Sequence, residues 1–444
     1  MPTSLPVLRV GGRHRKPKAP GPALRRAAVV AVAAPVAGTI LAGPSAFAAE
    51  KSGTGAAVLN PTERKIAANL NSRAQDARLG DRLSGVVIDA ESGRTVWGHD
   101  ATTALMPAST TKLATATAAL KVLGSDHRFT TKVVHAAGTL TLVGGGDRTL
   151  TTGDLTELAR TAASGLLDAG VTSVKVQVDD SLFPSPTLAT GWNNGYYPDS
   201  VAPVRALVVN GRHVTDTSLD AGQTFAQLLA EQGVTANGAV TRGVAGSGDT
   251  TVARHQSDQL SVIVRHMLKV SDNDIAESLL RTTALAAGRG PATFEGGAAV
   301  VREVLTQYGI SLRDFVIHDG SGLSRANRIP ARTVADILDV ASDPRHTDTL
   351  KHIVDGLPVA GEAGSTLGPE WGRFDTADSS CAVGRVKAKT GTLTGAIGLS
   401  GLTKAEDGHW KIFSFIENDS PAAPGAVKDA LDGLAATVNG CWAE

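Results

Sequence analysis

The sequence has no surplus of charge of either sign. Its 444 residues include 43 Lys and Arg and 43 Asp and Glu, so the formal net charge is zero. Proteins that bind nucleic acid usually do so through a strongly basic face, and we therefore expect no nucleic-acid partner. The charge is unevenly placed, because residues 1–48 hold seven basic residues and no acidic one. That segment differs in physical character from the rest of the chain.

Cysteine is scarce, and no metal-binding pattern is present. The two cysteines, Cys381 and Cys441, do not have the close spacing of metal ligands, and the 11 His include no H-E-x-x-H motif. A zinc peptidase is therefore disfavoured, and the sequence implies no cofactor. In an exported protein an even pair of cysteines suggests a disulfide, whereas two unpaired buried thiols are the alternative.

Long apolar runs are also missing after the first 48 residues. The N-terminal segment has basic residues, then a small-apolar stretch over Ala27–Ala42, then the small-x-small sequence Ala46-Phe-Ala48. This order predicts a signal peptide over 1–48 that is cleaved after Ala48. An uncleaved anchor is the alternative, but a stretch of about 16 residues interrupted by Pro35 and Gly38 is short for a membrane span. We expect an exported, extracytoplasmic protein at the cell wall or secreted, with no transmembrane segment in the mature chain.

Helix and strand patterns occur together at both ends of the mature chain, whereas its middle is rich in strand patterns. Over 126–254, short Val- and Thr-rich runs alternate with Gly and Asp, which predicts a β-rich inserted domain. Residues 49–125 and 255–444 are expected to form one α+β domain, with a central antiparallel sheet flanked by helices. Its predicted strands are Gly85–Ala90, Thr95–Trp97, Arg385–Thr392, Ile397–Leu402 and Lys411–Ile416. Helices are predicted over Thr62–Leu79, Pro107–Leu123, Asp154–Ala169, Leu260–Ala287, Glu295–Tyr308 and Ala426–Val438.

Three short motifs follow one another along the chain. They are Ser109-Thr-Thr-Lys112, Ser271-Asp-Asn273 and Lys389-Thr-Gly391. The first two patterns occur once each, and a second Lys-Ser/Thr-Gly occurs only at Lys51, before the other motifs. Each motif is weak alone, but the ordered trio is typical of penicillin-binding proteins and class A β-lactamases.

The first motif has the composition of an activated nucleophile. A serine hydroxyl needs a base within hydrogen-bond reach, and spacing i,i+3 at a helix start puts Ser109 and Lys112 on one face. The helix N-terminus favours an oxyanion beside Ser109. Lys112 can act as a base only if burial and a nearby cation lower its pKa, and Lys389 would be that cation. The structural alternative for Ser109 is a helix cap.

The second motif is expected to serve proton transfer and substrate binding. Ser271 would bridge the two lysines and relay a proton to the leaving amine. Asn273 would hold the substrate amide and help fix Lys112. The alternative is a capping run, because Ser, Asp and Asn all favour helix starts, and Asp272 is expected to be the cap.

The third motif is expected to bind the substrate backbone. Lys389 and Thr390 would bind a substrate carboxylate by charge and hydroxyl. Gly391 would let the strand approach the substrate closely. Thr392 would supply a second oxyanion N–H beside that of Ser109. A strand that ends in an ordinary turn is the alternative.

With these motifs in place, the sequence resembles peptidase family S13, the class C low-molecular-weight penicillin-binding proteins. Further stretches carry the resemblance: Gly85–Ala90, Leu142–Asp147, Val178–Ser181 and, most specifically, His318–Arg325. The family places its insertion between the first and second motifs, as expected here. The resemblance implies that Leu323, Ser324 and Arg325 line a pocket for a side chain of the stem peptide.

The resemblance implies an exported serine D-alanyl-D-alanine carboxypeptidase with endopeptidase activity. Its partners would be peptidoglycan stem peptides, trimmed through an acyl-enzyme on Ser109, and β-lactam antibiotics as covalent inhibitors. A serine β-lactamase or esterase is the nearest alternative, although no Glu-x-x-x-Asn lies between Lys112 and Ser271. A non-catalytic cell-wall-binding homologue is a second alternative. The balance of the two activities, the third stem residue, the role of the short insertion and the oligomeric state stay open.

Overall fold

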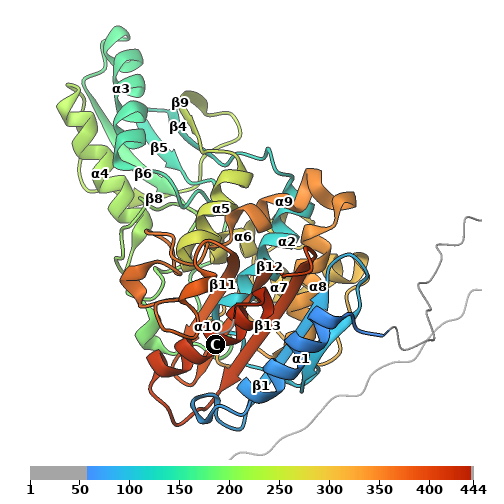
Figure 1. Cartoon of the computed structure of the whole chain (residues 1–444). Helices are drawn as coiled ribbons and strands as arrows, with labels where there is room; N and C mark the ends of the chain where they lie inside the picture. The colour runs from blue at the N-terminus through green and yellow to red at the C-terminus, as the bar shows by residue number, and fades with distance from the viewer. Residues whose placement is uncertain (1–57, 442–444) are drawn as a thin grey trace, which may run out of the picture. The chain divides into compact units, whose positions relative to one another are not determined.

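The computed structural model describes residues 58–441 (Figure 1). The signal peptide predicted over 1–48 lies outside the described residues. None of the helices between residues 58 and 441 is long and apolar enough to span a bilayer.

A five-stranded sheet joins the two ends of the chain, as predicted. Its strand order is β11-β12-β13-β1-β2, and all neighbouring strands are antiparallel. The strands are β1 (Leu83–Asp89), β2 (Thr95–His99), β11 (Val386–Leu393), β12 (Ala396–Lys404) and β13 (Trp410–Asn418). Because β1 pairs with β13, the last strand of the chain holds the first in place.

Both faces of this sheet are covered, so β1, β12 and β13 are buried along almost their whole length. Successive residues of a strand point to opposite faces. In β1, Val86 and Ile88 join the core that includes α8 (Ala331–Ser342). Val87 joins a second core with α1 (Pro61–Arg73) and α10 (Pro424–Asn439). All seven residues of β1 are buried as a result.

A fully buried helix begins at the first motif. A 3₁₀ turn over Ala108–Thr111 leads into α2 (Lys112–Leu123), whose residues are buried from Lys112 to Leu120. A helix that is apolar all round is packed all round, and α2 contacts five other helices. These are α5 (Leu260–Val270), α6 (Asn273–Ala286), α7 (Phe294–Gln307), α8 and α9 (Thr347–Gly356).

The helix predicted over Leu260–Ala287 is wrong as one element. It is two helices, α5 and α6, separated at the second motif. Ser271 has φ 64°, in the left-handed region that stops a helix. Asp272 is the N-cap of α6 and accepts a hydrogen bond from the Ile275 N–H at 2.8 Å, as predicted.

The helix predicted over Thr62–Leu79 is also shorter than expected. α1 ends at Arg73, and a separate 3₁₀ turn covers Ala77–Leu79. The side chain of Asp76 accepts the Arg78 N–H, which starts the new turn. This local hydrogen bond to a side chain thus takes the place of the backbone hydrogen bonds that would continue α1.

A second sheet is formed between the first and second motifs. Its order is β7-β6-β5-β4-β9, and β8 also pairs with β6. The strands are β4 (Thr130–Ala136), β5 (Thr139–Val143), β6 (Ser173–Asp179), β7 (Thr235–Ala236), β8 (Thr241–Arg242) and β9 (Thr250–Gln256). Two helices that pack on each other, α3 (Thr152–Asp168) and α4 (Thr217–Glu231), share its separate core. The domain boundaries at 126 and 254 stay a prediction.

Short elements complete the described chain. A two-stranded pair links β3 (Ala104–Leu105) to β10 (Ile329–Pro330). Further 3₁₀ turns cover Asn194–Tyr196, Pro344–His346, Pro369–Trp371 and Ser380–Ala382.

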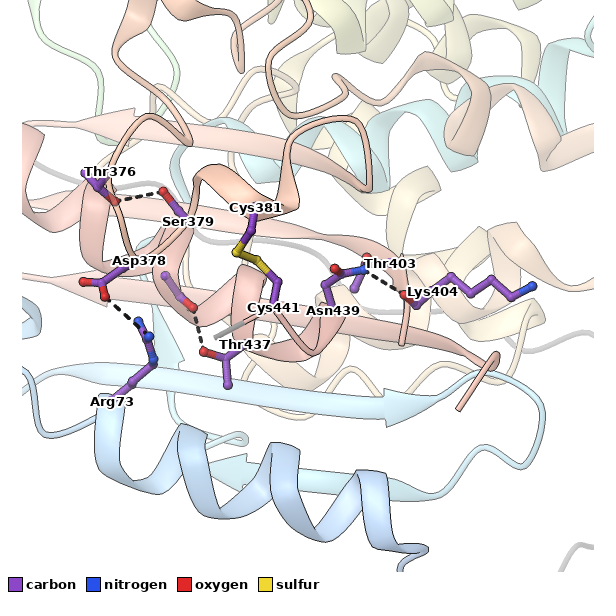
Figure 2. The surroundings of a disulfide bond; sticks show 11 residues. Arg73, Thr376, Asp378, Ser379, Cys381, Thr403, Lys404, Thr437, Asn439 and Cys441 are labelled. Carbon is purple, nitrogen blue, oxygen red and sulfur yellow. Dashed lines mark hydrogen bonds and ion pairs between the residues drawn. A yellow bond between two sulfur atoms is a disulfide. The ribbon is translucent and has the colours of Figure 1, made fainter. Parts of the chain in front are cut away.

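The two cysteines form a disulfide, which resolves the alternatives left open by the sequence. Cys381 lies in the loop before β11, and Cys441 follows α10, 60 positions later. Figure 2 shows the bond between these segments, beside an ion pair of 3.5 Å from Arg73 of α1 to Asp378. The bond ties the loop that precedes the third motif to the end of the chain.

Candidate active site

The first and second motifs meet at the amine of Lys112. Its Nζ donates hydrogen bonds to Ser109 Oγ at 3.1 Å, Asn273 Oδ1 at 2.7 Å and the Ser321 carbonyl at 2.8 Å. Side chains at i and i+3 eclipse one another in a 3₁₀ turn. The turn before α2 therefore aligns Ser109 with Lys112 more closely than an α-helix would.

Burial changes the acidity of Lys112. The side chain has no exposed surface, and desolvation lowers its pKa to about 8. Nearby carboxylates, led by Glu277, oppose this shift because they favour the charged ammonium. The amine can therefore lose its proton near neutral pH.

A buried carboxylate supports the loop that contacts Lys112. Glu277 of α6 has no exposed surface and accepts the backbone N–H groups of Gly320 and Ser321, the latter at 2.7 Å. Burial and the neighbouring Asp319 raise the pKa of Glu277 to about 7. The Ser321 carbonyl is thereby held against Lys112.

The break between α5 and α6 places the second motif. The left-handed Ser271 turns its hydroxyl towards the third motif, where it accepts a hydrogen bond from Lys389 Nζ at 2.9 Å. At the start of α6, Asn273 accepts from Lys112 and donates through Nδ2 to the Ser200 carbonyl at 2.8 Å. The chain from the inserted region thus helps to orient Asn273.

The third motif has a buried amine and a largely buried threonine that lines the cavity described below. Lys389 has no exposed surface, and burial together with the Lys112 and Arg373 charges lowers its pKa well below the usual value. Thr390 Oγ1 donates to Thr366 Oγ1 at 2.8 Å.

Gly391 is needed for close approach of strand and turn. A Cβ at this position would lie 2.8 Å from the Pro107 carbonyl oxygen and 3.2 Å from the Ser109 nitrogen. Ala108, next to the serine, has φ 47°, an uncommon backbone conformation for a residue with a side chain. The backbone of β11 is therefore packed directly against the turn that carries Ser109, whereas close approach of the strand to substrate stays a prediction.

A cavity of about 270 Å³ opens beside the serine. Its lining residues are Ser109, Val270, Ser271, Thr366, Trp371, Arg373, Thr390, Thr392 and Lys428. The first and third motifs and Ser271 therefore share one concave site, and both motif lysines lie behind its wall. This is the arrangement expected of a nucleophile that has a buried base behind it and a substrate-binding strand beside it.

Comparison with known proteins identifies the family. The model of the D-Ala-D-Ala carboxypeptidase 3 (S13) family matches residues 66–215 and 209–438. The chain belongs to the S13 family. The predicted serine-type D-Ala-D-Ala carboxypeptidase is thereby confirmed at the level of the family.

Curated S13 relatives are similar over most of their length. The carboxypeptidase DacB of Mycolicibacterium smegmatis is 34% identical over 404 residues, covering 86% of this chain and 85% of the relative. The D-alanyl-D-alanine carboxypeptidase of an Actinomadura species is 32% identical over 523 residues, covering 97% and 92%.

A solved structure shows the same fold. The structure of penicillin binding protein 4 from Haemophilus influenzae is 22% identical, with a TM-score of 0.70, and covers 83% of this chain and 97% of that one. The predicted fold class, a penicillin-binding-protein-like domain with a central antiparallel sheet, is confirmed.

In this structure, none of the residues that line the cavity is Leu323, Ser324 or Arg325. Leu323 is 8% exposed and packs in the core, and Ser324 is fully buried, with Oγ donating to the Thr190 carbonyl at 2.6 Å. Arg325 is exposed and donates to the Thr394 carbonyl at 2.8 Å, beyond the end of β11. Their role in binding a stem side chain stays a prediction, and Arg325 is the only one of the three with an accessible side chain.

Asp319 is the support of this loop, and sequence reasoning gave it no role. Its carboxylate accepts from Trp192 Nε1 and Asn327 Nδ2, each at 2.8 Å, and from the Ser324 N–H at 2.6 Å. The ring of Trp192 packs in the core of the S13 carboxypeptidase. A loop rich in Gly and Ser is thus held by two buried acids, Asp319 and Glu277.

Sequence reasoning also missed the cationic part of the cavity. Arg373 lies in the loop before β11, Lys428 lies on α10, and Trp371 is 60% exposed. None of them falls in a motif or in a periodic pattern of its own. Only the tertiary packing of α10 on the sheet brings them together.

Proposed function

We propose that this S13 chain is an exported carboxypeptidase that removes the terminal D-alanine from peptidoglycan stem peptides through an acyl-enzyme on Ser109. The observation that carries the proposal is the hydrogen-bond set of Lys112. A neutral amine has two N–H groups and one lone pair. With the N–H groups donated to Asn273 and Ser321, the lone pair faces Ser109 Oγ.

In the acylation step, Ser109 Oγ attacks the penultimate carbonyl carbon and its proton passes to Lys112 Nζ. The carbonyl becomes an oxyanion, held by the N–H groups of Ser109 and Thr392. The C–N bond then breaks, and a proton delivered through Ser271 leaves with the amine of D-alanine. Water hydrolyses the resulting ester and restores the Ser109 hydroxyl.

Substrate binding is assigned to the third motif and to Asn273. Lys389 and Thr390 bind the terminal carboxylate, which stabilises the charged form of Lys389 on substrate entry. Gly391 leaves space at the strand, and Asn273 binds the substrate amide. Penicillin, whose lactam carbonyl replaces the substrate carbonyl, would acylate Ser109. Acylation by penicillin is supported by a protein of the same fold, because penicillin binding protein 4 of Haemophilus influenzae has been solved in complex with a β-lactam.

Two measurements test the reaction. Intact-mass spectrometry with benzylpenicillin should show a persistent adduct of one penicillin on Ser109, and release of D-alanine should accompany incubation with a stem peptide. Both should vanish in Ser109→Ala and persist in Ser173→Ala, an exposed serine of β6. Rapid penicillin loss without an adduct would indicate a β-lactamase, and neither adduct nor turnover would indicate a non-catalytic protein.

Export is proposed on the N-terminal pattern and on the substrate, which lies outside the cytoplasm. The predicted cleavage after Ala48 gives a mature protein that begins at Ala49. N-terminal sequencing of protein recovered from the cell wall or medium tests this. An uncleaved N-terminus would favour the anchor.

A further inference from the structure

The cavity beside Ser109 is lined by two cationic side chains that the catalytic steps do not use. Of its nine lining residues, Arg373 and Lys428 are cationic and none is acidic. Both lie away from the three motifs in sequence, on the loop before β11 and on α10. The positive charge therefore faces a space that a ligand can enter.

Arg373 is held rigidly and keeps a donor edge free. Its Nε donates to Asp432 Oδ2 at 2.9 Å, and Nη2 donates to the other oxygen of that carboxylate. No residue in the part of the chain that the structure describes accepts from Nη1. The guanidinium is 4% exposed and lines the cavity. A pre-oriented Arg edge suits a carboxylate, because little side-chain freedom is lost on binding.

Lys428 adds the unbalanced charge. It is half-buried and forms no hydrogen bond or ion pair with another residue of 58–441. Asp432 balances one of the two cations, so one positive charge remains. Burial and the charge of Arg373 lower the pKa of Lys428, and the nearby Asp432 only partly opposes this shift. A bound carboxylate would oppose it further.

The terminal carboxylate of a D-alanine leaving group does not need these two cations. Its carbon is three bonds from the scissile carbonyl carbon, and Lys389 and Thr390 are the groups assigned to it. Arg373 and Lys428, which line the same cavity as Thr390, are therefore left for a second anionic group on the leaving residue.

Resting on the proposed function, we propose that Arg373 and Lys428 form a second carboxylate subsite on the leaving-group side. The subsite would take a D-amino acid leaving group whose side chain ends in a carboxylate. The methylene groups of such a side chain would pass the exposed ring of Trp371 at the cavity wall. The enzyme would then favour an anionic leaving residue over a neutral one of the same size.

Three peptides test this preference: diacetyl-L-Lys-D-Ala followed by D-Glu, D-Gln or D-Ala. The D-Glu and D-Gln peptides have almost the same shape and differ in charge. The measured quantity is the ratio of kcat/KM for the D-Glu peptide to that for the D-Gln peptide. A charge-assisted hydrogen bond predicts a ratio of about 10 for the wild type.

Lys428 is the residue to vary, because Arg373 forms a buried ion pair with Asp432 and its loss would leave a buried carboxylate unpaired. Lys428→Gln should bring the ratio to about 1–3, whereas Lys428→Arg should keep it near 10. Lys175→Gln, an exposed lysine of β6 without a side-chain hydrogen bond to other described residues, is the matched control and should leave the ratio unchanged. A wild-type ratio of 1, or a ratio that survives Lys428→Gln, overturns the subsite.

Release of D-Ala from the third peptide separates the two proposals. If D-Ala is released and Ser109→Ala abolishes the release, the proposed function stands and the ratio alone decides the subsite. If no peptide is cleaved and penicillin forms no adduct, both proposals fail together.

Discussion

Removing the disulfide should lower stability and leave catalysis intact. In the variant with Cys381→Ser and Cys441→Ser, the 60-residue separation between the two positions is no longer closed by a covalent bond. The chain-entropy model assigns a loop of this length about 4 kcal/mol of the free energy of unfolding. With an unfolding entropy of about 2.1 cal/mol/K for each of roughly 380 residues, this corresponds to a Tm lowered by about 5 °C.

Differential scanning calorimetry of the oxidised wild type, the reduced wild type and the double variant measures this effect. The reduced protein should match the variant, because both lack the same constraint. Neither cysteine lines the cavity, so D-alanine release at 25 °C should change by less than about twofold. Asp378→Asn, which weakens the half-exposed ion pair to Arg73 nearby, is the control and should cost less than about 1 kcal/mol.

An unchanged Tm in the double variant would refute the reasoning. It would mean that the loop before β11 and the end of the chain stay together in the unfolded state, or that unfolding begins elsewhere. A large loss of activity at 25 °C with native circular dichroism would be equally informative, because it would tie the loop that carries Arg373 to catalysis.

Three further predictions concern the catalytic centre. Because the active form of Lys112 is the neutral amine, kcat/KM for acylation should rise with pH and level off above about 8 in a pH series of D-alanine release. Glu277→Gln removes a charge that raises the pKa of Lys112, so the same profile should move to lower pH, and a profile that moves up would contradict this assignment. Gly391→Ala places a methyl group 2.8 Å from the Pro107 carbonyl oxygen and should lower kcat/KM at least about tenfold. Gly425→Ala, where a Cβ meets nothing within 4 Å, is its control and should be neutral by both activity and Tm.

The sequence allowed the composition of the site to be predicted better than its geometry. The ordered motifs indicated which side chains would lie together, because Lys112 is hydrogen-bonded to Ser109 and Asn273, and Lys389 is hydrogen-bonded to Ser271. The bridge from Ser271 to both lysines and the catalytic roles of these residues stay predictions. The burial of the central strands on both faces was also readable, since continuous apolar runs mark strands covered on both sides.

Other features depended on contacts that no local pattern records. The left-handed Ser271 interrupts a stretch that is amphipathic throughout, so periodicity alone predicted one helix. Helices α4, α8 and α9 were not predicted, although their buried faces are regular once the cores are known. Arg373 and Lys428 were missed because one lies in a loop and the other on a helix, and only packing makes them neighbours.

The pairing of β1 with β13 also affects how the protein matures. The native sheet contains contacts between segments more than 300 positions apart, and topologies dominated by such distant contacts fold slowly. The nucleophile is synthesised early, but the strand bearing Lys389 and its sheet neighbours are among the last segments made. The hydrolytic centre therefore cannot assemble while the chain is still growing, and a product truncated before β13 should be inert towards both peptide and penicillin.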